Sequence, residues 1–330
     1  MAYYLGLDAG GTKTECALAD DSTILARATA GTIKVMRTSN EEAEHNLQTL
    51  LQNIASQSGI ALASIACTCV GLAGISVSRV ADWVLHSLCI RVGGRVLLAG
   101  DEEIALDAAF SGGPGVLVIA GTGSNLAART SYGHLIHIGG WGPAVADEGS
   151  GNWIGKQAVR AVFDAVDRAK PTLLQKAILR EWGLVDLAGL IDRANASPSP
   201  DFSRLTRVVV ACAEEGDPYA NRILRQAGED LGMYAALAIQ RVIHAENSRP
   251  ESGAQRSQGP PHDLPEVAFS GSILSHIPAV WKAMSDAIHR KFPNVRIHSK
   301  AVDPVEGALW RARQAILCPT GEIADRAAKR

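Results

Sequence analysis

The chain has 330 residues, more than one core of ordinary size needs, which predicts two domains. Its formal net charge is −2, with acidic and basic residues interspersed, which argues against partners held by bulk charge, such as nucleic acid or an anionic membrane. No apolar run approaches the roughly 20 residues of a spanning helix, and the N-terminus lacks the basic start of a signal peptide. The six scattered cysteines suit reduced thiols, so we expect a cytoplasmic protein.

Short apolar runs alternate with helical patterns in the first part of the chain, which predicts an α/β fold with parallel strands. The expected elements are strands at 3–8, 15–19 and 23–29, a helix at 40–57, a strand at 65–72, a helix at 77–89, a strand at 95–99 and a helix at 101–110.

A glycine-rich stretch at 111–115 separates this part from a second one, in which strand, glycine–threonine turn and strand occur again. There we expect strands at 116–120, 125–130 and 135–138, helices at 153–169, 172–182, 187–195, 202–215 and 217–245, a strand at 267–270, a helix at 277–291, an edge strand at 295–299 and a closing helix at 305–317. We therefore predict an N-terminal domain at 1–114 and a C-terminal domain at 115–304.

Three further segments complete the predicted organisation. The closing helix 305–317 is expected to be able to pack back on the first domain. Residues 247–263 are polar and rich in Pro, Gly and Ser, which predicts a surface loop, and 318–330 form a tail.

Three glycine turns each follow a predicted buried strand: DAGGTK at 8–13, AGTGSN at 120–125 and FSGSI at 269–273. Glycine at such a turn lets main-chain N–H groups converge on an anion, although for any one turn alone a tight connection between elements is the commoner explanation. Neither G-x-x-x-x-G-K-[ST] nor a G-x-G-x-x-G after the first strand is present, which argues against a P-loop enzyme and a dinucleotide fold.

The order of these turns resembles the actin/Hsp70/sugar-kinase superfamily. The stretch GGWGPAVADEGSGNWIG at 139–155, together with the GTGSN before it, is similar to the N-acetylglucosamine kinases of the BadF/BadG/BcrA/BcrD ATPase family. The resemblance implies an α/β fold of two actin-like (ribonuclease H-like) lobes with a nucleotide cleft between them. It also implies an enzyme that uses ATP and Mg²⁺ to phosphorylate a hydroxyl of an amino sugar, N-acetylglucosamine or a related N-acetylhexosamine.

The resemblance also implies roles for particular residues. Asp101 is the expected catalytic base, and Asp8 is expected to hold Mg²⁺ through water. The expected ATP-binding residues are Gly10, Gly11, Thr12, Lys13, Gly121, Thr122, Gly123, Gly271 and Ser272, and the expected sugar-site residues are Asn125, Gly140, Asp147 and Gly151.

For Asp101 and Asp147, physical arguments that do not depend on the resemblance are also available. Asp101 follows the strand at 95–99, at the carboxyl edge where open α/β sheets bind ligands. Since Asp is also a favoured helix N-cap, it could instead cap the helix that follows. Asp147 could likewise cap the helix expected near Gly151.

One stretch departs from the family pattern. In similar N-acetylhexosamine kinases an asparagine after the third strand usually binds the sugar, whereas residues 30–37 here contain Lys34 and Arg37 and no asparagine. Both cations could face solvent. If Lys34 faces the cleft it becomes a substrate residue, because it would attract a carboxylate on the sugar and repel a free ammonium group.

Two alternatives come from other functional classes. Activator ATPases of radical dehydratases carry cysteines in or beside their phosphate loops, whereas the second loop here is AGTGSNLAAR, and Cys67 and Cys69 precede VGLAGIS instead. A non-catalytic sugar-sensing protein would not need Asp101. The expected partner is a small sugar, with no nucleic acid and no membrane, and a homodimer is the default assembly.

Overall fold

The computed structural model describes residues 1–72, 75, 77–248 and 264–317. Most of the loop predicted at 247–263 and all of the tail predicted at 318–330 lie outside the described residues. The chain forms two compact units. The first unit is Met1–Gly113 with the segment from Val302 onward, and the second unit is Pro114–Ala301.

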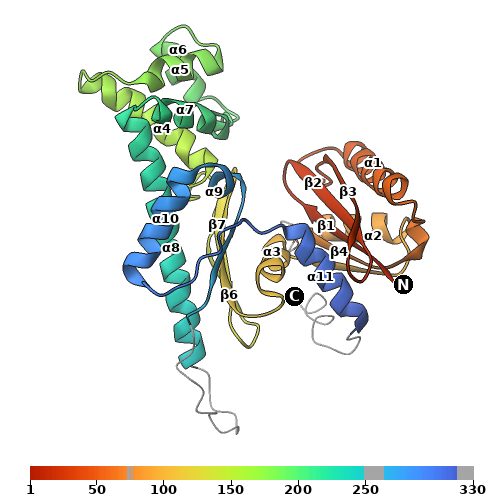
Figure 1. Ribbon diagram of the computed structural model, residues 1–330. Coiled ribbons are helices and arrows are strands. Elements are labelled where there is room, and N and C mark those ends of the chain that lie inside the picture. The colour runs from red at the N-terminus through yellow and green to blue at the C-terminus, as the bar shows by residue number, and fades with distance from the viewer. Residues whose placement is uncertain (73–74, 76, 249–263, 318–330) are drawn as a thin grey trace. The chain divides into compact units, whose positions relative to one another are not determined.

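A mixed five-stranded sheet forms the centre of the first unit (Figure 1). Its strands are β1 (Tyr3–Ala9), β2 (Lys13–Ala19), β3 (Ile24–Gly31), β4 (Ile65–Leu72) and β5 (Arg95–Ala99). Their order is β3-β2-β1-β4-β5, in which β1 to β3 are antiparallel and β4 and β5 run parallel to β1. The carboxyl ends of β1, β4 and β5 therefore meet at one edge of the sheet.

Helices cover both faces of this sheet. On one face pack α1 (Asn40–Ser58) and α2 (Ser78–Cys89), and on the other pack α3 (Asp101–Phe110) and the closing helix α11 (Pro304–Leu317). The backbones of α3 and α11 approach closely at Gly307, where an added Cβ would lie 1.7 Å from the Ile104 carbonyl oxygen. The absence of a side chain at Gly307 thus lets α11 lie directly against α3.

The second unit repeats the arrangement of the first sheet. Its strands are β6 (Gly115–Ala120), β7 (Ser124–Arg129), β8 (Leu135–Gly139) and β9 (Val267–Ser270), in the order β8-β7-β6-β9 with β9 parallel to β6. The prediction of a strand at 295–299 is wrong, because this segment forms a single bridge, between Ile297 and Val267. The partner of this bridge, β9, has only four residues, so the edge with which the segment could pair is short.

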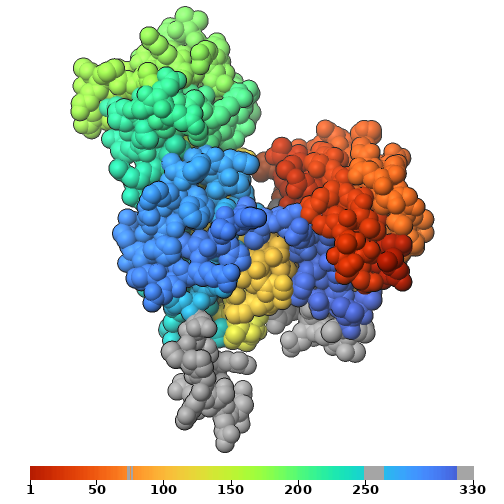
Figure 2. Space-filling view, viewed as in Figure 1, coloured from red at the N-terminus to blue at the C-terminus, as the bar shows by residue number. Residues whose placement is uncertain are grey.

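Helices make up most of the second unit. They are α4 (Gly151–Asp167), α5 (Leu173–Trp182), α6 (Leu187–Ala194), α7 (Thr206–Glu214), α8 (Pro218–Asn247), α9 (Ser272–His276) and α10 (Pro278–Lys291). The single helix predicted at 202–215 is divided into a 3₁₀ turn, Phe202–Leu205, and α7. Within this unit, α5, α6 and α7 gather beyond one end of the sheet, in green in Figures 1 and 2.

The longest helix, α8, supports the rest of the second unit. It packs along α10 through two glycines that leave no room for a side chain: a Cβ at Gly228 would lie 2.3 Å from the Val280 carbonyl oxygen, and one at Gly232 would lie 2.5 Å from the Ala287 Cβ. Across the ranges that the structure describes, no helix combines the length and the apolar character that crossing a membrane requires.

Candidate active site

The turn between β1 and β2 carries the first predicted phosphate-binding segment, and neighbouring elements hold it in place. The Thr32 hydroxyl, just after β3, donates to the Gly10 carbonyl oxygen at 2.8 Å. Asn46 of α1 donates from Nδ2 to the Thr32 carbonyl oxygen at 2.9 Å, and the Ile33 N–H donates to the Thr14 hydroxyl at 3.2 Å. These bonds fix the backbone of Gly10 relative to the sheet.

Gly11 in this turn and Gly121 in the turn between β6 and β7 share an unusual property. An added Cβ would meet no atom within 4 Å at either position, and neither φ lies in the left-handed region. Neither packing nor backbone conformation therefore requires glycine there. An approaching ligand does explain it, because a Cβ would occupy the space in which a phosphate contacts the main-chain N–H groups.

Replacing Gly11 by Ala is therefore expected to raise the KM for ATP by about 10-fold or more, the scale of losing a charged hydrogen bond. The melting temperature should stay level or rise, since Ala restricts the unfolded chain. Gly59→Ala is the matched control: Gly59 ends α1 at φ 70°, so its replacement should lower the melting temperature and leave the KM unchanged. Equal KM values for Gly11→Ala and the parent would contradict a phosphate site at this turn.

Carboxylates gather at the edge of the first sheet beside this turn. Asp8 is near the end of β1, and burial raises its pKa to about 7, with further contributions from the charges of Asp101, Glu15 and Asp303. Lys13 opposes the shift but is itself ion-paired with Glu15. Asp8 thus lies among negative groups, of which Glu15 is ion-paired with Lys13 and Asp303 with Arg27.

This acidic group fits a magnesium ion. Carboxylate oxygens are the ligands that Mg²⁺ prefers, and Asp8 lies within electrostatic reach of three further carboxylates, Asp101, Glu15 and Asp303. Asp8 is the residue that would hold the ion, directly or through water. Glu15 and Asp303 were not among the predicted site residues, because their proximity depends on the pairing of β2 with β1 and on the return of the chain to the first unit.

Asp101 is the first residue of α3, directly after β5, and lies at the same sheet edge as Asp8. The reading of Asp101 as the N-cap is wrong, since Gly100 occupies that position. The helix is held by Arg311 of α11, which donates from Nε to Asp107 and from Nη1 to Glu103, each at 2.7 Å. The direction in which α3 presents Asp101 is thereby fixed.

The turn between β6 and β7 is bonded to the start of α4. The Gly121 carbonyl oxygen accepts from the Gly151 N–H at 2.8 Å, and the Thr122 carbonyl oxygen accepts from the Asn152 N–H at 3.1 Å. Since carbonyl groups of the turn are bound on the side of α4, the helix sets the orientation of the turn.

Asp147 lies against the turn between β6 and β7. Its carboxylate accepts from the Gly142 N–H at 3.1 Å, and its Oδ2 would lie 2.8 Å from a Cβ added at Gly123. Burial raises the pKa of Asp147, which the Gly142 N–H opposes. The alternative that Asp147 caps α4 is wrong, because Ser150 is the N-cap and accepts from the Trp153 N–H. The contact of Asp147 with the sugar stays a prediction.

The remaining predicted residues of the second unit lie around the same strand ends. Asn125 pairs with Gly139, and a Cβ at Gly140 would lie 3.0 Å from the Asn125 Cβ. Gly271 has φ 95°, and a Cβ there would lie 2.3 Å from the Ala120 carbonyl oxygen, so this turn lies against the end of β6. Ser272 then begins α9. The predicted residues of this unit are thus brought together.

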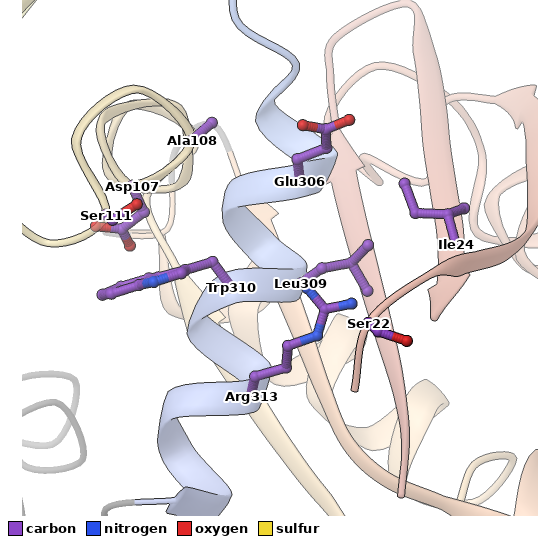
Figure 3. Close-up of a pocket in the computed structure, with 9 residues that line it drawn as sticks. All are labelled: Ser22, Ile24, Asp107, Ala108, Ser111, Glu306, Leu309, Trp310 and Arg313. Atoms are coloured by element: carbon purple, nitrogen blue, oxygen red, sulfur yellow. The ribbon is translucent and has the colours of Figure 1, made fainter. Parts of the chain in front are cut away.

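The first unit contains a cavity of about 350 Å³. It lies between the end of α3, the helix α11 and the β2–β3 turn, where Trp310, Arg313 and Leu309 project from α11 (Figure 3). This turn is at the opposite end of the sheet from the β1–β2 turn. None of the residues that line the cavity is a predicted site residue.

Solved structures share this fold. A structure from Chromobacterium violaceum that is assigned as an N-acetylglucosamine kinase has a TM-score of 0.67 and 27% identity, over 94% of this chain and 98% of that chain. A ROK family glucokinase from Streptomyces griseus, solved with glucose and AMPPNP, has a TM-score of 0.55 and 14% identity, over 95% and 100%. The predicted α/β fold of two actin-like lobes is confirmed, and the nucleotide cleft stays a prediction.

Curated relatives match over nearly their whole length. The N-acetylmuramic acid/N-acetylglucosamine kinase of Clostridium acetobutylicum is 28% identical, over 95% of this chain and 99% of the relative. The N-acetyl-D-glucosamine kinase of Dictyostelium discoideum is 25% identical, over 92% and 96%. The sequence pattern of one family, the BadF/BadG/BcrA/BcrD ATPases, matches residues 5–312. The chain belongs to the BadF/BadG/BcrA/BcrD ATPase family.

Proposed function

We propose that the protein is an ATP-dependent kinase that phosphorylates a hydroxyl of an amino sugar, N-acetylglucosamine or a related N-acetylhexosamine. The observation that carries the proposal is the pair Asp8 and Asp101 at one sheet edge, beside a glycine turn whose backbone is open to a ligand. The names of the relatives from Clostridium acetobutylicum and Dictyostelium discoideum support an amino-sugar acceptor.

Phosphoryl transfer needs a positioned hydroxyl, an acceptor for its proton and neutralisation of the phosphate charge. Asp101 takes the proton of the sugar hydroxyl as that oxygen attacks the γ-phosphorus, and ADP leaves. The N–H groups of the turns at 10–13 and 121–123 donate to phosphate oxygens. Magnesium held by Asp8 through water supplies further charge neutralisation when bound.

Two cysteines count against the activator-ATPase alternative. Cys67 and Cys69 are fully buried in β4, on the face that α11 covers. Burial raises the pKa of the Cys67 thiol to about 11 and that of Cys69 to about 12, and a protonated thiol is a poor ligand for an iron–sulfur cluster. The contacts of Arg311 hold α3, the helix that begins with Asp101. Since a sugar sensor would not need a catalytic base, the presence of Asp101 favours an enzyme.

Purified protein with ATP and Mg²⁺ should phosphorylate N-acetylglucosamine, measured as sugar phosphate by ³¹P NMR together with ADP release. Glucose and buffer alone serve as controls for acceptor selectivity and idle hydrolysis. Removing Mg²⁺ with a chelator should stop turnover, and adding it back should restore it. ADP release that no amino sugar accelerates would overturn the proposal.

The cytoplasm is the proposed compartment. The described cysteines that carry free thiols, Cys16, Cys67, Cys69, Cys89 and Cys212, suit a reducing environment.

A homodimer is the proposed assembly, and light scattering of the purified protein measures it directly.

A further inference from the structure

Lys34 has an environment that its sequence position alone does not explain. Its side chain is half-buried, and burial lowers the pKa of its ammonium group, an effect that the Asp101 carboxylate opposes. Among the residues that the structure describes, its ammonium group has no hydrogen-bond acceptor and no ion-pair partner. Partly burying an unpaired charge costs free energy, so a lysine that only needed to be solvated would extend into water.

The backbone around Lys34 is held firmly. Its N–H donates to the Thr32 hydroxyl at 3.1 Å, and its carbonyl oxygen accepts from the Arg37 N–H at 2.7 Å. Thr32 in turn donates to Gly10 of the phosphate turn, and the neighbouring Ile33 is fully buried. The position of Lys34 is therefore tied to the turn beside Asp8.

Arg37, the other cation of this segment, differs from Lys34. It is exposed, and it follows Lys34 in the same tight turn. The chain thus presents one cation to solvent and keeps the other within electrostatic reach of Asp101. This contrast makes Arg37 an internal control for Lys34.

We propose that Lys34 binds a carboxylate on the acceptor, so that the site selects an amino sugar with an acidic substituent over its neutral counterpart. The inference rests on the proposed function, since Asp101 marks where the acceptor hydroxyl lies. A carboxylate would give the ammonium group the hydrogen-bonded partner that it lacks within the protein. A free ammonium substituent, as in glucosamine, would be repelled.

A matched pair of acceptors tests the charge without changing the size. N-acetylmuramic acid carries a lactyl carboxylate on N-acetylglucosamine, and its lactyl amide is a neutral analogue of nearly the same shape. The parent protein should show a kcat/KM for the acid roughly 10- to 100-fold above that for the amide, the range expected for one charge-assisted hydrogen bond.

The variant Lys34→Met keeps an unbranched stem of similar length and removes the charge. It should lose most of the preference for the acid, so that its kcat/KM falls at least 10-fold more on the acid than on the amide. Lys34→Arg should retain part of the preference. Arg37→Met, the control, should keep the parent's ratio of acid to amide.

Equal losses on acid and amide in Lys34→Met would overturn the inference and assign Lys34 to the phosphate that is transferred. A parent protein that uses both acceptors equally, or that prefers glucosamine, would overturn it as well. A parent that phosphorylates none of the amino sugars would instead contradict the proposed function. The two failures are therefore distinguishable.

Discussion

Replacing Asp101 by Asn is expected to lower kcat at least about 100-fold, the usual scale for losing a general base. Asn keeps the shape of the side chain but cannot accept the proton of the sugar hydroxyl. The KM for ATP should change little, because the glycine turns that are predicted to bind phosphate do not depend on Asp101 for their backbone contacts.

Steady-state kinetics with N-acetylglucosamine and saturating ATP measure this effect. The melting temperature of Asp101→Asn should stay near that of the parent, since Gly100 and not Asp101 is the N-cap of α3. Glu102→Gln changes the next acidic residue of the same helical turn and should lose far less activity. A near-normal kcat in folded Asp101→Asn would leave Asp101 with only a structural role.

Replacing Asp8 by Asn is expected to stabilise the metal-free protein above neutral pH while it abolishes efficient turnover. The pKa of Asp8 is raised to about 7 in the folded protein, above the ordinary value of 3.8. The folded state therefore keeps a proton between these pH values that the unfolded state has released. Stability contributed by this proton is full below pH 3.8, falls as the pH rises to about 7, and is gone above it.

At pH 8 the parent carries a charged Asp8 among Asp101, Glu15 and Asp303, whereas Asn adds no charge there. The gain in unfolding free energy for Asp8→Asn should be roughly 1–4 kcal/mol at pH 8 and clearly smaller at pH 5, because one pKa unit corresponds to about 1.4 kcal/mol and partial exposure reduces the effect.

Denaturant unfolding of the metal-free proteins at pH 5 and pH 8 measures this difference. Asp192→Asn, which changes an exposed carboxylate of α6, is the control and should show the same small effect at both pH values. Mg²⁺ should stabilise the parent more at pH 8 than at pH 6, and should do so much less in Asp8→Asn. A gain for Asp8→Asn that is equal at both pH values would argue against the raised pKa.

The amino-acid sequence by itself determined the local elements and the class of fold. Runs such as 65–72 and 95–99 are short and mostly apolar, and the predicted strands match β4 and β5. The helix predicted at 40–57 matches α1 because apolar residues recur there at helical spacing. The glycine turns were also visible, since each follows a buried strand.

Only the tertiary structure decided which side chains share an environment. Asp303 joins Asp8 because the chain returns to the first unit after nearly 200 residues of the second, and no local pattern records that return. Likewise, Lys34 and Arg37 are both cations in one short segment, and only packing distinguishes a half-buried charge from an exposed one. Periodicity reports which face of an element is apolar, whereas the field at a charged group depends on every element packed around it.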